Sequence, residues 1–180
     1  ERGQADHGWL QSQHTFSFAS YYDPDYMGVS ALRVINDDKV APGKGFQTHS
    51  HQDMEIISYV KKGNIEHKDS MGNIEKLPAG EFQIMSAGTG VTHSEYNPSA
   101  TESLEFLQIW IQPNKQGIRP AYQQKHFNET CGLQLIASPD ARDSSLLIHQ
   151  DACLYQLHLS MGQSVSHNIG KGRTIYIHII

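Results

Sequence analysis

The sequence lacks features that would each point to a particular class of protein. No apolar run approaches the roughly 18 residues of a membrane-spanning helix, so we expect no membrane segment. Basic residues form no block and the net charge at pH 7 is −5, so direct binding to nucleic acid is not expected. A long apolar stripe with helical spacing is also missing, which disfavours an α-helical fold.

Cysteine is scarce. The 180 residues include two cysteines, Cys131 and Cys153, whose spacing matches no CxxC motif. Two scattered cysteines in a chain of this size are typical of buried free thiols in a reducing compartment. We therefore predict two buried free thiols and a cytoplasmic location. The alternatives for the cysteines are a disulfide or a reactive thiol.

Short apolar runs separated by turn residues are what the sequence has instead. Examples are EIISYV (55–60), FQIM (82–85) and LEFLQIWI (104–111), each followed by a turn that contains glycine, asparagine or proline. Strands about 8–12 residues apart with such turns are typical of sandwiches and barrels. A second β-rich stretch starts near Gly132 and runs to RTIYIHII (173–180). The fold class that we predict is all-β.

The chain divides into two predicted modules. The first covers 1–112, and the second begins at 132. The segment 113–131 is polar, carries two prolines and is interpreted as a linker. The sequence stops inside an expected strand, so we expect the second module, 132–180, to be incomplete.

Two pairs of side chains point to a metal site. His49 and His51 directly precede the run at 55–60, and His93 and Glu95 lie at the start of a later expected strand. Residues i and i+2 of a strand share a face, so each pair projects together. If a barrel brings the pairs side by side, three imidazoles and one carboxylate converge. That set suits a divalent first-row metal and leaves positions open for water, substrate or O2.

Simpler explanations exist for each piece, because histidines also pair on surfaces by chance. If the strand is regular, Glu55 points to the same face as His49 and His51. Glu55 is therefore an alternative carboxylate ligand to Glu95. His67 is of interest because it lies in an expected strand between the two ligand segments. The histidines outside the two pairs are interpreted as structural or surface residues: His7, His14, His67, His126, His149, His158, His167 and His178.

The two segments resemble the cupin motifs. The first motif, G-x5-H-x-H-x3,4-E-x6-G, is matched from Gly43 to Glu55, with the last glycine one residue late. The second, G-x5-P-x-G-x2-H-x3-N, has Ser86 in place of proline and His93 two residues late. These departures are similar to the pirin branch of the cupins, as are GNIEHKDSMGN (63–73) and SAGTGVTHSE (86–95). The resemblance covers essentially the whole chain.

The resemblance implies a bicupin, in which two β-barrels of the jelly-roll type face each other and only the N-terminal one holds metal. It implies His49, His51, His93 and Glu95 as ligands, with Glu55 as a rival ligand or a residue behind the site. The implied ion is a divalent transition metal, Fe(II) first, with Zn, Ni, Co, Mn or Cu as alternatives.

Bacterial pirin-like proteins cleave flavonols such as quercetin with O2, opening the central ring and releasing carbon monoxide. The resemblance thus implies a dioxygenase, and we hypothesise that Glu95 also accepts the flavonol 3-hydroxyl proton. The alternatives are a redox-sensitive, metal-loaded regulator that acts through a protein partner, and a metal-stabilised barrel without chemistry. Side chains that could form an apolar substrate pocket, although core packing is the simpler explanation for each, are Phe46, Met54, Phe82, Met85, Phe106 and Trp110.

Overall fold

The structure is a computed structural model that describes residues 2–128 and 130–180. These residues form fourteen β-strands and one short 3-10 helix (Arg142–Ser144), and they contain no α-helix. The predicted all-β class is therefore confirmed. None of the described helices is long and apolar enough to cross a membrane.

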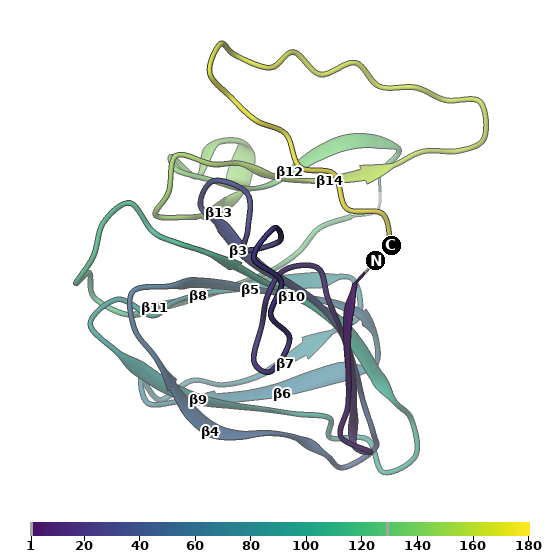
Figure 1. Cartoon of the computed structure of the whole chain (residues 1–180), viewed down its shortest axis with the longest axis vertical. Coiled ribbons are helices and arrows are strands. Elements are labelled where there is room, and N and C mark those ends of the chain that lie inside the picture. The colour runs from purple at the N-terminus through teal and green to yellow at the C-terminus, as the bar shows by residue number, and fades with distance from the viewer. Residues whose placement is uncertain (1, 129) are drawn as a thin grey trace.

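Two sheets enclose the first barrel. The larger has the strand order β1 (Gly3–Asp6), β2 (Leu10–His14), β3 (Leu32–Val40), β10 (Leu104–Ile111), β5 (Glu55–Lys62), β8 (Glu81–Ser86), β11 (Ala121–His126). The smaller has the order β4 (Gly45–His51), β9 (Val91–Tyr96), β6 (Asn64–Asp69), β7 (Ile74–Pro78). We call the space between the two sheets the barrel interior (Figure 1).

The seven-stranded sheet is covered on both faces, because it lies between the four-stranded sheet and the residues from 132 onward (Figure 1). On β5, Ile56 and Val60 pack in the barrel interior, whereas Ile57 packs on the opposite face. Side chains alternate between faces along a strand, so double coverage requires apolar residues at successive positions. This explains the nearly continuous apolar runs of β5, β8 and β10.

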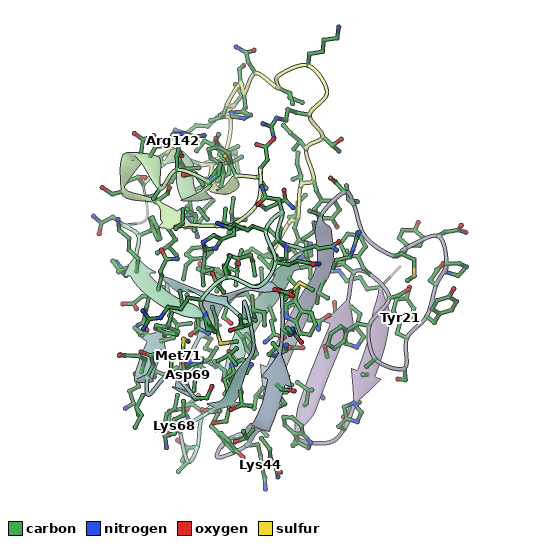
Figure 2. All side chains as sticks on the ribbon, turned by 90° about the vertical axis from the view of Figure 1, so that its left-hand side faces the viewer. Tyr21, Lys44, Lys68, Asp69, Met71 and Arg142 are labelled. Carbon is green, nitrogen blue, oxygen red and sulfur yellow. The ribbon has the colours of Figure 1, made fainter. Side chains whose placement is uncertain are left out.

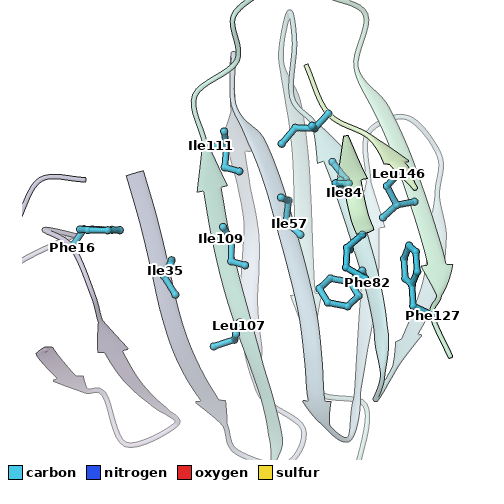
Figure 3. Close-up of a cluster of buried hydrophobic side chains, with 13 residues drawn as sticks. Phe16, Ile35, Ile57, Phe82, Ile84, Leu107, Ile109, Ile111, Phe127 and Leu146 are labelled. Carbon is cyan, nitrogen blue, oxygen red and sulfur yellow. The ribbon is translucent and has the colours of Figure 1, made fainter. Parts of the chain in front are cut away.

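The face away from the barrel interior packs against the second region, residues 132–180. Figure 3 shows the aliphatic and aromatic side chains that fill this contact. We call the buried set the outer cluster; it consists of Phe16, Ile35, Ile57, Phe82, Ile84, Leu107, Ile109, Ile111, Phe127, Ile136, Ala137, Leu146 and Ile148.

The second region forms a three-stranded sheet of β13 (Leu146–Leu147), β12 (Gly132–Ser138) and β14 (Leu154–His158). The strand predicted at RTIYIHII is wrong, because residues 173–180 have no strand hydrogen bonding. Ile177 and Ile179 of this segment are 76% and 83% exposed. An alternating pattern forms a strand only where a neighbouring strand accepts its backbone hydrogen bonds and a core covers one face.

The segment 113–131 is not only a linker. Residues 121–126 form β11, which pairs with β8 from Ala121↔Ser86 to His126↔Glu81. The interpretation as a linker is therefore wrong for this strand, while the domain limits themselves stay a prediction. The expectation of buried thiols is also wrong, because Cys131 and Cys153 are both free and exposed.

Candidate metal centre

The barrel interior is apolar at both ends and polar between them. One end is filled by Leu10, Val40, Val60, Ile65, Leu77, Leu104 and Phe106, and the other by Ile56, Met85, Ala87 and Val91. Between the two apolar clusters lie buried polar side chains from five strands: Ser58, His67, Gln83, His93, Glu95 and Gln108. A buried polar group is costly unless it is hydrogen-bonded or bound to an ion, so this layer is a candidate site.

The pairing of β4 with β9 brings the two predicted histidine segments together. His49 lies directly opposite His93, after a register irregularity between Phe46 and His49. Gly45 permits the close approach of the two strands, since a Cβ there would lie 2.3 Å from the carbonyl oxygen of Glu95. His49 and His51 lie at the end of β4 and not at the start of β5. The expectation that the pair opens the strand at 55–60 is therefore wrong.

Three imidazoles converge at this crossing. His49 Nε2 lies 3.0 Å from His93 Nε2, and one nitrogen from each of His49, His51 and His93 lies within 4.8 Å of the other two. Burial, then the neighbouring His49, lowers the pKa of His51 to about 4, and burial lowers that of His93 to about 2. Both rings are therefore neutral near pH 7, which is the form that binds metal.

The ring nitrogens of these histidines are oriented for an ion. His49 Nδ1 lies 2.7 Å from the carbonyl oxygen of Gln47, so Nδ1 carries the hydrogen and Nε2 presents a lone pair. His93 Nε2 faces His49 Nε2 at 3.0 Å, and His51 Nε2 is buried without a hydrogen-bond partner. A buried imidazole nitrogen without a proton donor fits a ligand, and the donor set suits a divalent transition metal.

Glu95 lies behind the histidines, held by three hydrogen bonds. Its Oε1 accepts from Ser58 Oγ and Gln83 Nε2, each at 3.3 Å, and its Oε2 accepts from Gln108 Nε2 at 2.9 Å. Burial raises the pKa of the Glu95 carboxyl to about 7, even though these hydrogen bonds favour its charged form. The donors come from β5, β8 and β10, so the large sheet holds a carboxylate that the small sheet provides.

The four predicted ligands fall into two overlapping groups. His49, His51 and His93 form one group, and Glu95 is grouped with His93 and His67, again within 4.8 Å. His93 belongs to both groups and therefore links them. For Glu95 to join an ion at the three histidines, its side chain has to turn away from the amide donors that hold it here.

Glu55, the rival carboxylate, lies elsewhere. Its Oε2 accepts from Ser86 Oγ at 2.9 Å and from the backbone N–H of His149 at 3.3 Å. The reason is local: β4 ends at His51, Asp53 has φ of +47°, and β5 begins at Glu55. The parity argument assumed one regular strand, and this turn moves Glu55 to the face of the large sheet that meets the second region.

The sequence reasoning missed part of the polar layer. It singled out His67 but not Asp69, whose Oδ2 lies 3.0 Å from His67 Nε2. Burial opposes ionisation of Asp69, but hydrogen bonds from Asn73 and His67 outweigh it and lower the pKa of Asp69. Figure 2 shows Asp69 beside Met71, at the end of the molecule far from Arg142. The alternation His67-x-Asp69 could have signalled a third inward pair.

Two of the expected pocket residues contact the histidines. The Trp110 ring lies 5.0 Å from the His51 ring and the Phe46 ring lies 6.5 Å from the His49 ring, between centroids. Phe82 instead belongs to the outer cluster. The described residues also line surface hollows of about 500 and 450 Å³, but neither contains a candidate ligand. His49 and His51 of β4 are partly exposed, so the histidines can be reached from the β4 side.

Comparison with known proteins gives the family of the chain. The family model described as Pirin matches residues 1–111. The chain belongs to the pirin family. A second model, described as the quercetinase C-terminal cupin domain, matches residues 135–180 of this pirin. The predicted cupin fold is confirmed.

Relatives of this pirin with assigned names are similar over its whole length. The chain is 59% identical, over all 180 residues and 78% of the relative, to a quercetin 2,3-dioxygenase of Escherichia coli. The crystal structure of YhhW from Escherichia coli matches 86% of the chain with 65% identity and a TM-score of 0.85. The chain spans 66% of that crystallised protein. The structure of YhhW with nickel(II) matches 87% of the chain and 67% of YhhW, with 63% identity and a TM-score of 0.84.

Proposed function

We propose that this pirin is a metal-dependent dioxygenase that opens the central ring of a flavonol such as quercetin with O2 and releases carbon monoxide. The observation that carries the proposal is the convergence of three imidazoles beside one buried carboxylate. The names of the relatives support the substrate class. The two free cysteines are compatible with the cytoplasm as its place of action.

The chain supplies ligands from two strands. His49 and His51 of β4 and His93 and Glu95 of β9 would hold a divalent ion, Fe(II) in this proposal. When bound, the ion supplies a Lewis acid that lowers the pKa of the flavonol 3-hydroxyl and a centre for O2 chemistry. The indole of Trp110, which borders the His51 ring, offers an apolar surface for a flat aromatic substrate.

Glu95 is the proposed general base. Its carboxyl group lies in the barrel interior at 2% exposure, so water does not compete for the proton that it takes from the 3-hydroxyl. Gln83, Gln108 and Ser58 hold the carboxylate on the side away from the histidines and stabilise its charge. A rotation of this side chain would bring it from its amide donors to the substrate or the ion.

The test is turnover of quercetin by the purified chain loaded in turn with Fe(II), Ni, Co, Mn, Cu and Zn. Quercetin absorbance is followed with and without O2, and released carbon monoxide is measured. We expect O2-dependent turnover with a redox-active ion and none with Zn. Absence of turnover with all six metals, together with specific capture of a protein partner, would instead favour the regulator.

A matched pair of variants tests the base. Glu95→Gln should keep part of its metal and lose turnover by about 100- to 10,000-fold, because a positioned proton acceptor contributes about that much. Glu55→Gln is the control, since Glu55 is equally buried but faces the second region. Normal turnover in Glu95→Gln would show that Glu95 is not the base.

A further inference from the structure

His67 and Asp69 lie on the same sheet face as the candidate ligands, yet no step of the proposed function uses them. In the pairing of β6 with β9, His67 lies opposite Glu95 and Asp69 lies opposite His93. The side chains of His67 and Asp69 are fully buried. Two inward pairs, each a histidine followed by an acid, thus face each other in antiparallel strands.

The hydrogen on the His67 ring can be placed from its surroundings. Asp69 Oδ1 accepts the backbone N–H groups of Met71 and Asn73 at 2.9 and 3.1 Å, and Asp69 Oδ2 accepts Asn73 Nδ2 at 2.8 Å. A carboxylate held in this way is an acceptor, so His67 Nε2, at 3.0 Å, is the donor. In the neutral form of the ring, His67 then has a lone pair at Nδ1, and this buried atom has no hydrogen-bond partner.

His93 needs a hydrogen-bond acceptor if it binds an ion. If its Nε2, which faces His49 Nε2 at 3.0 Å, serves as a ligand, the ring hydrogen is at Nδ1. His93 Nδ1 is also buried without a partner. An unpaired buried N–H is costly, and a metal-binding histidine almost always donates its other N–H to an acceptor.

An unused acceptor close to His93 is Nδ1 of His67. The rings of His67 and His93 have centroids 5.4 Å apart, and a nitrogen of each lies within 4.8 Å of the other. The oxygens of Glu95 already accept three hydrogen bonds. Tyr122 of β11 lies against His67, with ring centroids 4.8 Å apart, and closes that side of the ring.

We propose that His67 is a positioning residue of the metal centre, whose Nδ1 accepts a hydrogen bond from Nδ1–H of His93 when His93 Nε2 binds an ion. This inference rests on the metal site of the proposed function. The ring centroids lie 5.4 Å apart, so a rotation of the rings would bring the two Nδ1 atoms to hydrogen-bond distance. Asp69 fixes the ring of His67, His67 fixes that of His93, and the ligand nitrogen becomes more basic.

The experiment measures Zn(II) affinity of the purified chain by competition with a chelator, without any turnover. His67→Leu should weaken Zn(II) binding by about 10- to 100-fold, because the acceptor for His93 is lost. His67→Asn, whose side-chain oxygen takes the place of Nδ1, should stay within about threefold of the parent. His14→Leu is the control, because His14 is a buried, hydrogen-bonded histidine outside this site.

A histidine-ring NMR spectrum of the Zn(II)-loaded parent gives a second measurement that needs no variant. We expect His67 with its hydrogen on Nε2 and His93 with a hydrogen-bonded hydrogen on Nδ1. A hydrogen on Nδ1 of His67 would overturn the inference, even if His67→Leu failed to fold.

The failure of this inference can be distinguished from that of the proposed function. If the parent binds no Zn(II), the metal site itself is wrong and the inference falls with it. If the parent binds Zn(II) but His67→Leu binds it equally well, only the role of His67 is overturned. Equal losses in His67→Leu, His67→Asn and His14→Leu would show a general effect on folding and would also overturn that role.

Discussion

The first barrel and the second region use histidine in different ways. In the barrel, His49, His51, His67 and His93 converge on one face of the four-stranded sheet. In the second region, histidines occur at 149, 158, 167 and 178, and within the described part of the chain none belongs to a group of three potential ligands. Four histidines of the barrel thus share one sheet face and the four of the second region do not, so strand pairing, and not the presence of histidines alone, creates the site.

Burial differs in the same way. The barrel interior buries polar groups from several strands between two apolar clusters, whereas residues 159–180 are almost entirely exposed and contain no strand. A metal site requires a framework that holds its ligands within a fraction of an ångström. The comparison therefore predicts that changes in the barrel have large effects and that matched changes in the second region have small ones.

The largest effect is expected in the barrel core. Phe106→Ala should lower the free energy of unfolding by about 3–5 kcal/mol, because a fully buried ring is replaced by a cavity. Leu157→Ala in β14, where Leu157 is 47% exposed, should change it by less than about 0.5 kcal/mol. Urea unfolding of both variants measures the difference. Similar losses would contradict the contrast between the regions.

The next effect concerns metal retention. His93→Ala should weaken binding of Zn(II) by at least about 100-fold, because His93 belongs to both groups of potential ligands and its loss removes a nitrogen from each. His167→Ala, in an exposed part of the second region, should leave binding unchanged. Chelator competition and elemental analysis provide the measurement. A metal-loaded His93→Ala protein would place the ion elsewhere.

Glu55 tests the contact between the regions. Glu55→Gln should lower the free energy of unfolding by about 1–3 kcal/mol, because a buried carboxylate that accepts from Ser86 and His149 loses its charge. Its metal affinity should stay within about threefold of the parent, since Glu55 faces away from the histidines. Unfolding and Zn(II) competition are measured on the same sample. A collapse of metal binding would make Glu55 the ligand.

The smallest effect is a change in how stability of the metal-free protein depends on pH. Burial raises the pKa of Glu95 from 4.5 to about 7, so between these values the folded state binds the extra proton and stability falls as pH rises. Burial lowers the pKa of His93 from 6.5 to about 2, so there the unfolded state binds the extra proton and stability rises with pH. The two effects oppose each other between pH 4.5 and 6.5.

Removal of the Glu95 carboxyl group leaves the effect of His93 on the pH dependence of stability unopposed. In Glu95→Gln the slope of unfolding free energy against pH in this window should become more positive, by up to about 1.4 kcal/mol per pH unit. Urea unfolding at several pH values measures the slope. An unchanged slope would show that Glu95 does not carry a proton in the folded state at these pH values.

Several features were predictable because they depend only on strand periodicity. His49-x-His51 and His93-x-Glu95 project to one face wherever both segments are extended, and β4 and β9 are. The pairing of β4 with β9, which makes one site of two pairs, is a long-range property, and the sequence could only suggest it through family motifs. Ser58, Gln83 and Gln108 carry no signal of their own, because they become partners of Glu95 only when two sheets pack.

The failed predictions have local or tertiary causes. Glu55 left the expected face because Asp53, with its positive φ, turns the chain there. β11 was missed because AYQQKH has no apolar alternation, since its residues are mostly half-buried. RTIYIHII has the alternation but no strand partner among the described residues. A strand requires both an alternating sequence pattern and a neighbouring strand to pair with. AYQQKH has the partner without the pattern, and RTIYIHII has the pattern without a partner.

Strand β11 also sets where the first barrel could be excised as an autonomous fragment. A cut at the predicted boundary after residue 112 would remove β11 and leave β8, an apolar strand, with a row of unpaired backbone groups. An exposed strand edge of this kind promotes aggregation, because a strand of another molecule can pair with it. It would also uncover the ring of His67, which Tyr122 shields. A fragment that ends beyond His126 keeps both protections, so the barrel extends further along the chain than the segment that carries the ligands.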